Sequence, residues 1–119
     1  VSDPTVDVLG HCTGRYMSGR TRPPSEFDAE AVFGACAENG VAVEINCQPR
    51  RQDPPSGLLR LAVDSGCRFS IDSDAHAPGE LSWVADGCDR AVLQGVPPER
   101  VVTTLSADEL LGWTGRRRG

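Results

Sequence analysis

The chain has 119 residues, which is long enough for one small domain with a core and too short for two. Acidic residues outnumber basic ones by 17 to 12, and the formal net charge of −5 argues against non-specific binding of nucleic acid through bulk charge. No apolar run approaches the roughly 18 residues that a membrane span needs, so we expect no membrane partner.

Short apolar runs alternate with amphipathic stretches along the chain, a pattern typical of βα units around a parallel sheet or barrel. The first run ends at a glycine and a histidine, and a long loop rich in Arg, Gly and Pro follows it. An α/β fold is therefore expected, and its predicted elements are, in chain order, a strand at 6–9, a helix at 28–39, a strand at 41–46, a helix at 56–65, a strand at 67–72 and a helix at 80–90.

The helix predicted over residues 80–90 has four apolar side chains at helical spacing, and we expect them to form its buried face: Leu81, Val84, Ala85 and Cys88. Residues 96–102 are expected to pack at the edge of the sheet. The last helix has a capping-box pattern at Ser106 and Glu109, in which each side chain satisfies a free N–H group of the first turn. We expect it to bury Leu110, Leu111 and Trp113, and we expect residues 114–119 to be a disordered tail.

The five cysteines are odd in number, and none forms a C-x-x-C pair. Cys36 and Cys88 fall on apolar faces of predicted helices, and Cys67 opens a predicted strand. Free thiols in a reducing compartment explain this pattern better than disulfides, so we expect a cytoplasmic protein.

Polar residues of the kinds that bind metals lie at the end of each predicted strand. His11 follows the first strand, Glu44 and Asn46 close the second, and Asp74 and His76 follow the third. The C-terminal ends of parallel strands converge on the ligand site of α/β folds. Both histidines of the chain lie at such ends, and this coincidence is the main argument from the residues themselves for a metal site.

Simpler interpretations of the same residues stay open. Asp74 would then cap the following helix, with His76 on the surface and His11 in a structural hydrogen bond. Glu44 and Asn46 would be interior polar residues satisfied by their neighbours. A buried glutamate still needs a cation, a proton or a metal beside it.

Arginines form a second group at the same predicted edge. Arg15 lies in the loop after the first strand, and Arg50 and Arg51 lie in the loop after the second. A guanidinium fork matches the oxygens of a phosphate, so a metal beside arginines indicates a phosphoester substrate. The alternative is a solvated, charge-balancing loop. The first loop is long enough to carry Arg20 and Arg22 away from the site.

Four motifs carry a resemblance to a known family. They are D-V-L-G-H-C-T-G-R at residues 7–15, E-I-N at 44–46, R-Q-D at 51–53 and D-S-D-A-H at 72–76. In order and spacing they resemble the C-terminal half of a PHP (polymerase and histidinol phosphatase) domain. The closest likeness is to the PHP module of bacterial family X DNA polymerases and to its free-standing relatives, and it covers nearly the whole chain.

The resemblance implies a distorted (β/α)7 barrel with parallel strands, of which this chain is the C-terminal part. It also implies up to three divalent metal ions (Zn, Mn or Fe) at the strand ends. By motif, the metal ligands would be His11, Asp74 and His76, of which Asp74 and His76 would also be catalytic. The residues at the substrate would be Arg15, Arg51 and Asn46.

The opening H-x-H motif and the middle ligands of the family have no counterpart here, and the first residue is Val1 rather than Met. Residues 1–119 are therefore expected to be the second half of a domain whose N-terminal barrel half is absent. Three ligands form only part of a multi-metal site.

The function implied for the parent protein is metal-dependent phosphoester hydrolysis by metal-activated water. The substrate would be a DNA 3′ end, as for a 3′-5′ exonuclease, or a small phosphate monoester. One alternative is a non-catalytic structural or interaction module. Another is an inactive half-barrel that associates with a second copy through exposed sheet edges and an open apolar face.

Overall fold

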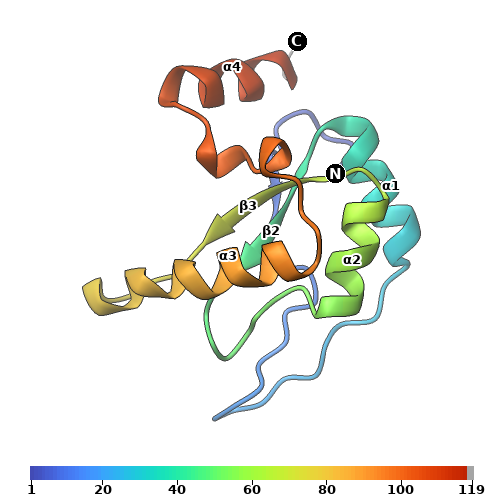
Figure 1. Cartoon of the computed structure of the whole chain (residues 1–119). Coiled ribbons are helices and arrows are strands. Elements are labelled where there is room, and N and C mark those ends of the chain that lie inside the picture. The colour runs from blue at the N-terminus through green and yellow to red at the C-terminus, as the bar shows by residue number, and fades with distance from the viewer. Residues whose placement is uncertain (118–119) are drawn as a thin grey trace.

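The structure is a computed structural model that describes residues 1–117 and has an α/β fold (Figure 1). Its elements are β1 (Val8–Leu9), α1 (Ala29–Asn39), β2 (Ala42–Asn46), α2 (Ser56–Asp64), β3 (Arg68–Asp72), the 3₁₀ helix η1 (Pro78–Trp83), α3 (Val84–Leu93), the 3₁₀ helices η2 (Pro98–Arg100) and η3 (Val102–Thr104), and α4 (Ala107–Arg117). The order of strands and helices is the predicted one.

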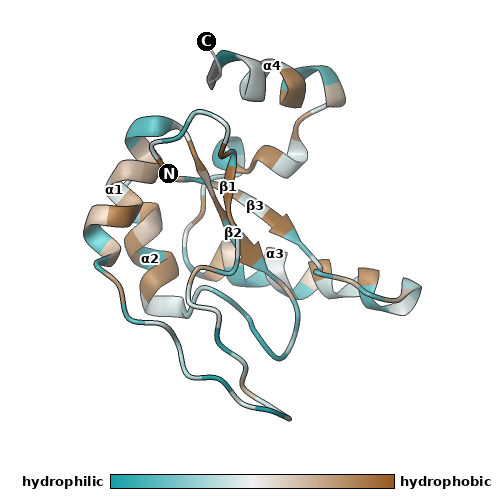
Figure 2. Ribbon diagram, turned by 180° about the vertical axis from the view of Figure 1, so that it is seen from behind, coloured by the Kyte–Doolittle hydropathy of each residue, from teal (hydrophilic) through white to brown (hydrophobic). Residues whose placement is uncertain are grey.

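The three strands form one parallel sheet in the order β1-β2-β3. Between β1 and β2, Val8 pairs with Ala42, and between β2 and β3, Asn46 pairs with Asp72. Right-handed crossovers in one direction place successive helices on the same side of a sheet. Accordingly α1 and α2 lie side by side (Figures 1 and 2). The next helix, α3, packs on the same face, and Arg60 of α2 donates a hydrogen bond to Gln94 at the end of α3 (3.5 Å). Among the described residues the sheet is open, and the barrel stays a prediction.

The core lies on one face of the sheet, around β2, its central strand. Val43 and Ile45 of β2 belong to this core, whereas Glu44 and Asn46 alternate with them and lie on the opposite face. Figure 2 shows that hydrophobic residues are concentrated in the strands and hydrophilic residues in the long loops. The largest fully buried apolar side chains come from β2, its neighbours and the two covering helices: Phe33, Val41, Val43, Ile45, Leu59 and Phe69.

The ends of two helices follow from local sequence. At the start of α1 the Asp28 carboxylate accepts a hydrogen bond from the amide of Ala31 (3.1 Å), and Gly40 ends the helix with a left-handed φ of 66°. The predicted capping box of α4 is confirmed. The Ser106 amide donates to the Glu109 carboxylate and the Glu109 amide donates to the Ser106 hydroxyl, both at 3.2 Å.

The buried face predicted for residues 80–90 is wrong. Leu81 is 64% exposed, and Val84, Ala85 and Cys88 are exposed too. The segment begins as the 3₁₀ helix η1, and the α-helix α3 starts only at Val84. The residues of α3 that face the sheet are small ones, Gly87 and Ala91.

The end of the chain also differs from expectation. Leu110 and Leu111 are 38% and 68% exposed, because α4 lies apart from the sheet (Figures 1 and 2). Residues 114–117, predicted to be disordered, continue α4, which its capping box stabilises locally. Residues 118–119 of the predicted tail lie outside the described part. The segment before α4 does pack at the sheet edge, through a parallel bridge between Phe69 and Val101.

All five cysteines are free thiols. In residues 1–117, every helix is too short or too polar to cross a lipid bilayer.

Gly87 is the point at which α3 approaches the sheet most closely. A Cβ atom there would lie 2.0 Å from the Cys47 sulfur and 3.1 Å from the Ile71 side chain. We therefore expect Gly87→Ala to lower the free energy of unfolding by about 1–3 kcal/mol, measured by urea denaturation.

The matched control is Gly34→Ala in α1, where a new Cβ meets no atom within 4 Å. That variant should be neutral or more stable by about 0.5–1 kcal/mol, because alanine restricts the unfolded chain. Equal effects of the two substitutions would contradict the close approach of α3.

Candidate functional site

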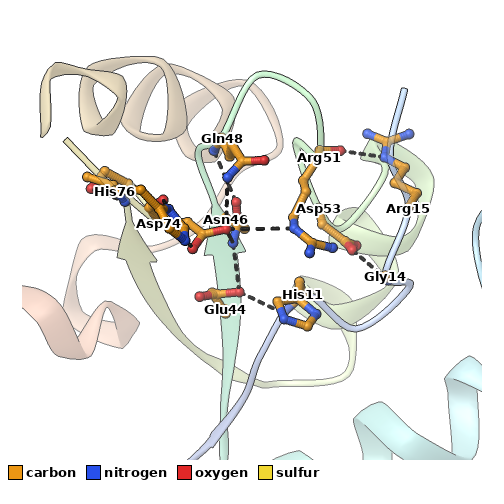
Figure 3. Close-up of polar contacts among 12 residues, drawn as sticks. His11, Gly14, Arg15, Glu44, Asn46, Gln48, Arg51, Asp53, Asp74 and His76 are labelled. Carbon is orange, nitrogen blue, oxygen red and sulfur yellow. Dashed lines mark hydrogen bonds and ion pairs between the residues drawn. The ribbon is translucent and has the colours of Figure 1, made fainter. Parts of the chain in front are cut away.

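The candidate site lies at the carboxyl ends of β2 and β3, where Asn46 links two carboxylates (Figure 3). The side-chain amide of Asn46 donates to Glu44 Oε1 (3.3 Å) and to Asp74 Oδ2 (3.2 Å). Its carbonyl oxygen accepts from the backbone amide of Gln48 at 3.0 Å. Asn46 is fully buried and holds Asp74 in position, and its role in substrate binding stays a prediction.

Asp74 follows the end of β3 and has a left-handed backbone with φ of 52°. Its carboxylate also accepts from the Gln48 side chain (3.2 Å) and forms an ion pair with Arg51 Nε at 3.7 Å. The alternative in which Asp74 caps the next helix is therefore not what the structure shows. The carboxylate instead points toward the end of β2 (Figure 3).

His76 lies beside Asp74, and its side chain is 74% exposed. Its Nδ1 is 2.8 Å from the backbone carbonyl oxygen of Asp74. A carbonyl oxygen only accepts hydrogen bonds, so this contact favours the tautomer with the proton on Nδ1. The lone pair of Nε2 is then directed away from that contact and is available to a ligand.

His11 lies on the other side of Glu44 and Asn46 from His76 (Figure 3). Its backbone amide donates to Glu44 Oε1 at 2.6 Å, and its φ is 23°. Within residues 1–117 no three His, Cys, Asp or Glu side chains lie close enough to hold one metal ion. The structure thus brings Asp74 and His76 together but does not add His11 to them, and the three-ligand set stays a prediction.

Negative charge is concentrated at this edge of the sheet. Burial, followed by the neighbouring carboxylates of Glu44 and Asp74, raises the pKa of Asp72 from its ordinary 3.8 to about 7. A divalent cation would relieve this repulsion, and carboxylate and imidazole groups are suitable donors. The residues therefore fit a metal ion in their chemistry, while this chain provides only part of a coordination shell.

The two arginines predicted to contact substrate have different surroundings. Arg51 is 12% exposed and lies 4.2 Å above the ring of Tyr16, next to Asp74. Arg15 donates through Nε to the carbonyl oxygen of Arg51 (2.7 Å) and through Nη2 to that of Gln52. Arg51 thus borders the site directly, whereas Arg15 holds the backbone that carries Arg51.

A hollow of about 280 Å³, called here the His76 hollow, opens beside these groups. Its lining residues are Tyr16, Gln48, Arg50, His76, Glu80 and Trp83. The sequence analysis assigns no role to four of these residues: Tyr16, Gln48, Glu80 and Trp83. They lie outside the predicted strand ends and outside the four motifs of the family resemblance.

Asp53 is a further residue without an assigned role, and it joins the loops around the site. Its buried carboxylate accepts from the Thr13 hydroxyl (2.9 Å), the Thr13 amide (3.2 Å) and the Gly14 amide (3.0 Å). Its backbone carbonyl accepts from the amide of Asn46 at 2.8 Å. The sequence signals for Asp53 are its place in the R-Q-D motif at 51–53 and its position before two prolines in a polar loop.

Comparison with known proteins gives two similarities, and no protein-family model matches the chain. The chain is 34% identical over 71 residues to the DNA polymerase/3′-5′ exonuclease PolX of Bacillus subtilis, which is 60% of this chain and 12% of that protein. It is 28% identical over 106 residues to a probable phosphatase of Vibrio parahaemolyticus, which is 83% of this chain and 40% of that protein. The chain thus spans less than half the length of either relative. One relative is a family X polymerase and the other is a phosphatase. These two similarities confirm the resemblance to polymerase-linked PHP modules and their free-standing relatives.

We expect Asp53→Asn to lower the free energy of unfolding by about 2–3 kcal/mol. The Asp53 carboxylate has two acceptor oxygens for its donors in Thr13 and Gly14, whereas an asparagine side chain has only one. Some of these buried donors would therefore lose their hydrogen-bond partner. Thermal and urea denaturation would measure the loss. Asp64→Asn, at an exposed position, is the matched control and should change stability by no more than about 0.5 kcal/mol.

The raised pKa of Asp72 predicts a pH dependence of stability. Because the folded protein holds this proton more tightly than the unfolded chain, Asp72 favours folding most below pH 3.8, and this contribution is lost as the pH rises through about 7. The free energy of unfolding, measured with EDTA present, should therefore fall across this window more steeply in the wild type than in Asp72→Asn. Parallel pH profiles for the two proteins would contradict the assignment.

Proposed function

We propose that this chain is the C-terminal half of a PHP-type domain and forms part of a metal-dependent phosphoesterase. The observation that carries the proposal is the Asp74 carboxylate, which is fixed at the strand ends beside Arg51 and next to the His76 hollow. The two relatives are named an exonuclease and a phosphatase, and both names denote phosphoester hydrolysis, which supports the proposal.

Asp74 and His76, with His11, are the proposed metal ligands of this chain. The ions would be zinc, manganese or iron, up to three in the complete domain, with the remaining ligands supplied by residues beyond this chain. Such ions supply a nucleophile from water near neutral pH and neutralise charge on phosphoryl oxygens.

The other residues of the site have positioning and binding roles. Asn46 and Gln48 hold the Asp74 carboxylate in one orientation. The proton on Nδ1 of His76 leaves Nε2 as the donor atom. Arg51, with Arg50 at the hollow, would orient the phosphate of the substrate, and Arg15 positions Arg51 through its backbone.

Two substrates fit this chemistry, a DNA 3′ end and a small phosphate monoester. The first agrees with the name of the relative called a 3′-5′ exonuclease, and the second with the name of the relative called a probable phosphatase. We also propose a cytoplasmic location, because free thiols are typical of a reducing compartment.

A second candidate is a non-catalytic structural or interaction module, which includes a half-barrel that associates with another copy. The observation in its favour is that no three-ligand group occurs among residues 1–117. The two candidates differ in metal content, since a structural module should bind little or no metal.

The test of the catalytic proposal is hydrolysis and metal content of the intact protein with Mn²⁺ and with each substrate type. Asp74→Ala should lower kcat/KM by about a hundredfold or more and should also lower the bound metal. Asp89→Ala, an exposed position on α3, is the control and should leave both unchanged. Unchanged hydrolysis in Asp74→Ala would remove this residue from the mechanism.

A further inference from the structure

The loop after β1 is folded back on itself, and this brings three arginines to one place. Tyr16 and Arg22 exchange two backbone hydrogen bonds of 2.8 and 2.9 Å, and the amide of Met17 donates to the carbonyl oxygen of Arg50 at 2.7 Å. The hairpin of residues 16–22 is thereby joined to the loop after β2. Arg20 and Arg22, which the sequence left free to lie far from the site, are held near Arg50.

These residues form a second hollow of about 540 Å³, called here the arginine hollow. Its lining residues are Tyr16, Ser18, Arg20, Thr21, Arg22, Pro23 and Arg50. Tyr16 and Arg50 also line the His76 hollow, so the two hollows adjoin at this pair of side chains. Groups bound in the two hollows would therefore lie on either side of Tyr16 and Arg50.

The charge of the arginine hollow is not balanced by the protein. Within the part of the chain that the structure describes, Arg20, Arg22 and Arg50 form no ion pair, although the chain has 17 acidic residues. The acidic groups of the site lie at the strand ends, where Asp74 pairs with Arg51 instead. Three neighbouring guanidinium groups without a carboxylate form a site for an anion, and Arg matches phosphate oxygens best.

The size of the hollow favours a group larger than a phosphate alone. Its volume of about 540 Å³ lies within the range of small-molecule sites, which is roughly 300–1,000 Å³. The hydroxyl groups of Ser18 and Thr21 and the ring of Tyr16 give it further polar and stacking contacts.

We propose that the arginine hollow binds a second phosphate of the substrate, next to the phosphate that occupies the His76 hollow. This proposal rests on the proposed function for the role of the His76 hollow. The substrate is then a molecule with at least two phosphate groups. Two sources share this chemistry, a single strand of nucleic acid and a small polyphosphate, and the specificity residues are Arg20 and Arg22.

The test is binding to the intact protein, measured by titration with EDTA present so that no turnover occurs. The probes are a hexathymidylate, inorganic tripolyphosphate and thymidine monophosphate. Arg20→Gln/Arg22→Gln should weaken binding of a probe with several phosphates by about tenfold and change monophosphate binding less than about twofold. For the hexathymidylate, the slope of log affinity against log salt should become shallower by about 1.4.

The matched control is Arg60→Gln/Arg68→Gln, which removes the same charge from exposed positions outside both hollows. Selective loss of hexathymidylate binding identifies a strand as the source, and selective loss of tripolyphosphate binding identifies a small polyphosphate. Equal loss in the two double variants, or no loss in the first, overturns the proposal. Binding is measured apart from hydrolysis. Unchanged hydrolysis in Asp74→Ala would therefore count against the proposed mechanism and leave this binding result standing.

Discussion

The arrangement of the site depends on one buried carboxylate, that of Asp53. It accepts hydrogen bonds from Thr13 and Gly14, while its backbone carbonyl accepts from the end of β2 at Asn46. The loop after β1 and the loop after β2 are thereby fixed to each other and to the sheet. A carboxylate that is taken out of water needs such donors, so the loops cannot separate without leaving it unsatisfied. Arg15 directly follows Gly14 in the sequence, and its side chain holds the backbone of Arg51.

The fixed loops place opposite charges side by side. The strand ends carry carboxylates, and burial together with the neighbouring Glu44 and Asp74 raises the pKa of Asp72. The loops above them carry arginines, of which only Arg51 pairs with a carboxylate in the described residues. An edge of this kind is complementary to a cation on one side and to an anion on the other. A metal ion and a phosphate together satisfy both halves, which is why the phosphoesterase proposal accounts for more of the structure than a metal site alone.

Much of the fold could be predicted because its signals are local. The apolar residues of β2 and the caps of α1 and α4 could be recognised without knowledge of distant residues. The face of α3 could not be predicted in the same way, because the contact of Gly87 with Cys47 depends on how closely a helix approaches the sheet. Within the site, strand ends indicated Asp74 and His76 correctly as neighbours. They could not show that His11 lies across Glu44, or that Arg20 and Arg22 return to Arg50, since both depend on the course of loops.

Among residues 1–117, three residues other than glycine have a left-handed backbone, and all lie in the loops at the carboxyl edge: His11, Gln52 and Asp74, with φ of 23°, 42° and 52°. Such conformations cost on the order of 1 kcal/mol or more for a residue with a side chain, and Asp and His adopt them more readily than most. β-branched residues are almost excluded there. The part of the fold that carries the chemistry is thus the part with the least freedom to accept new side chains. Variants selected only for thermal robustness would tend toward glycine at these positions and would lose the imidazole or the carboxylate in doing so.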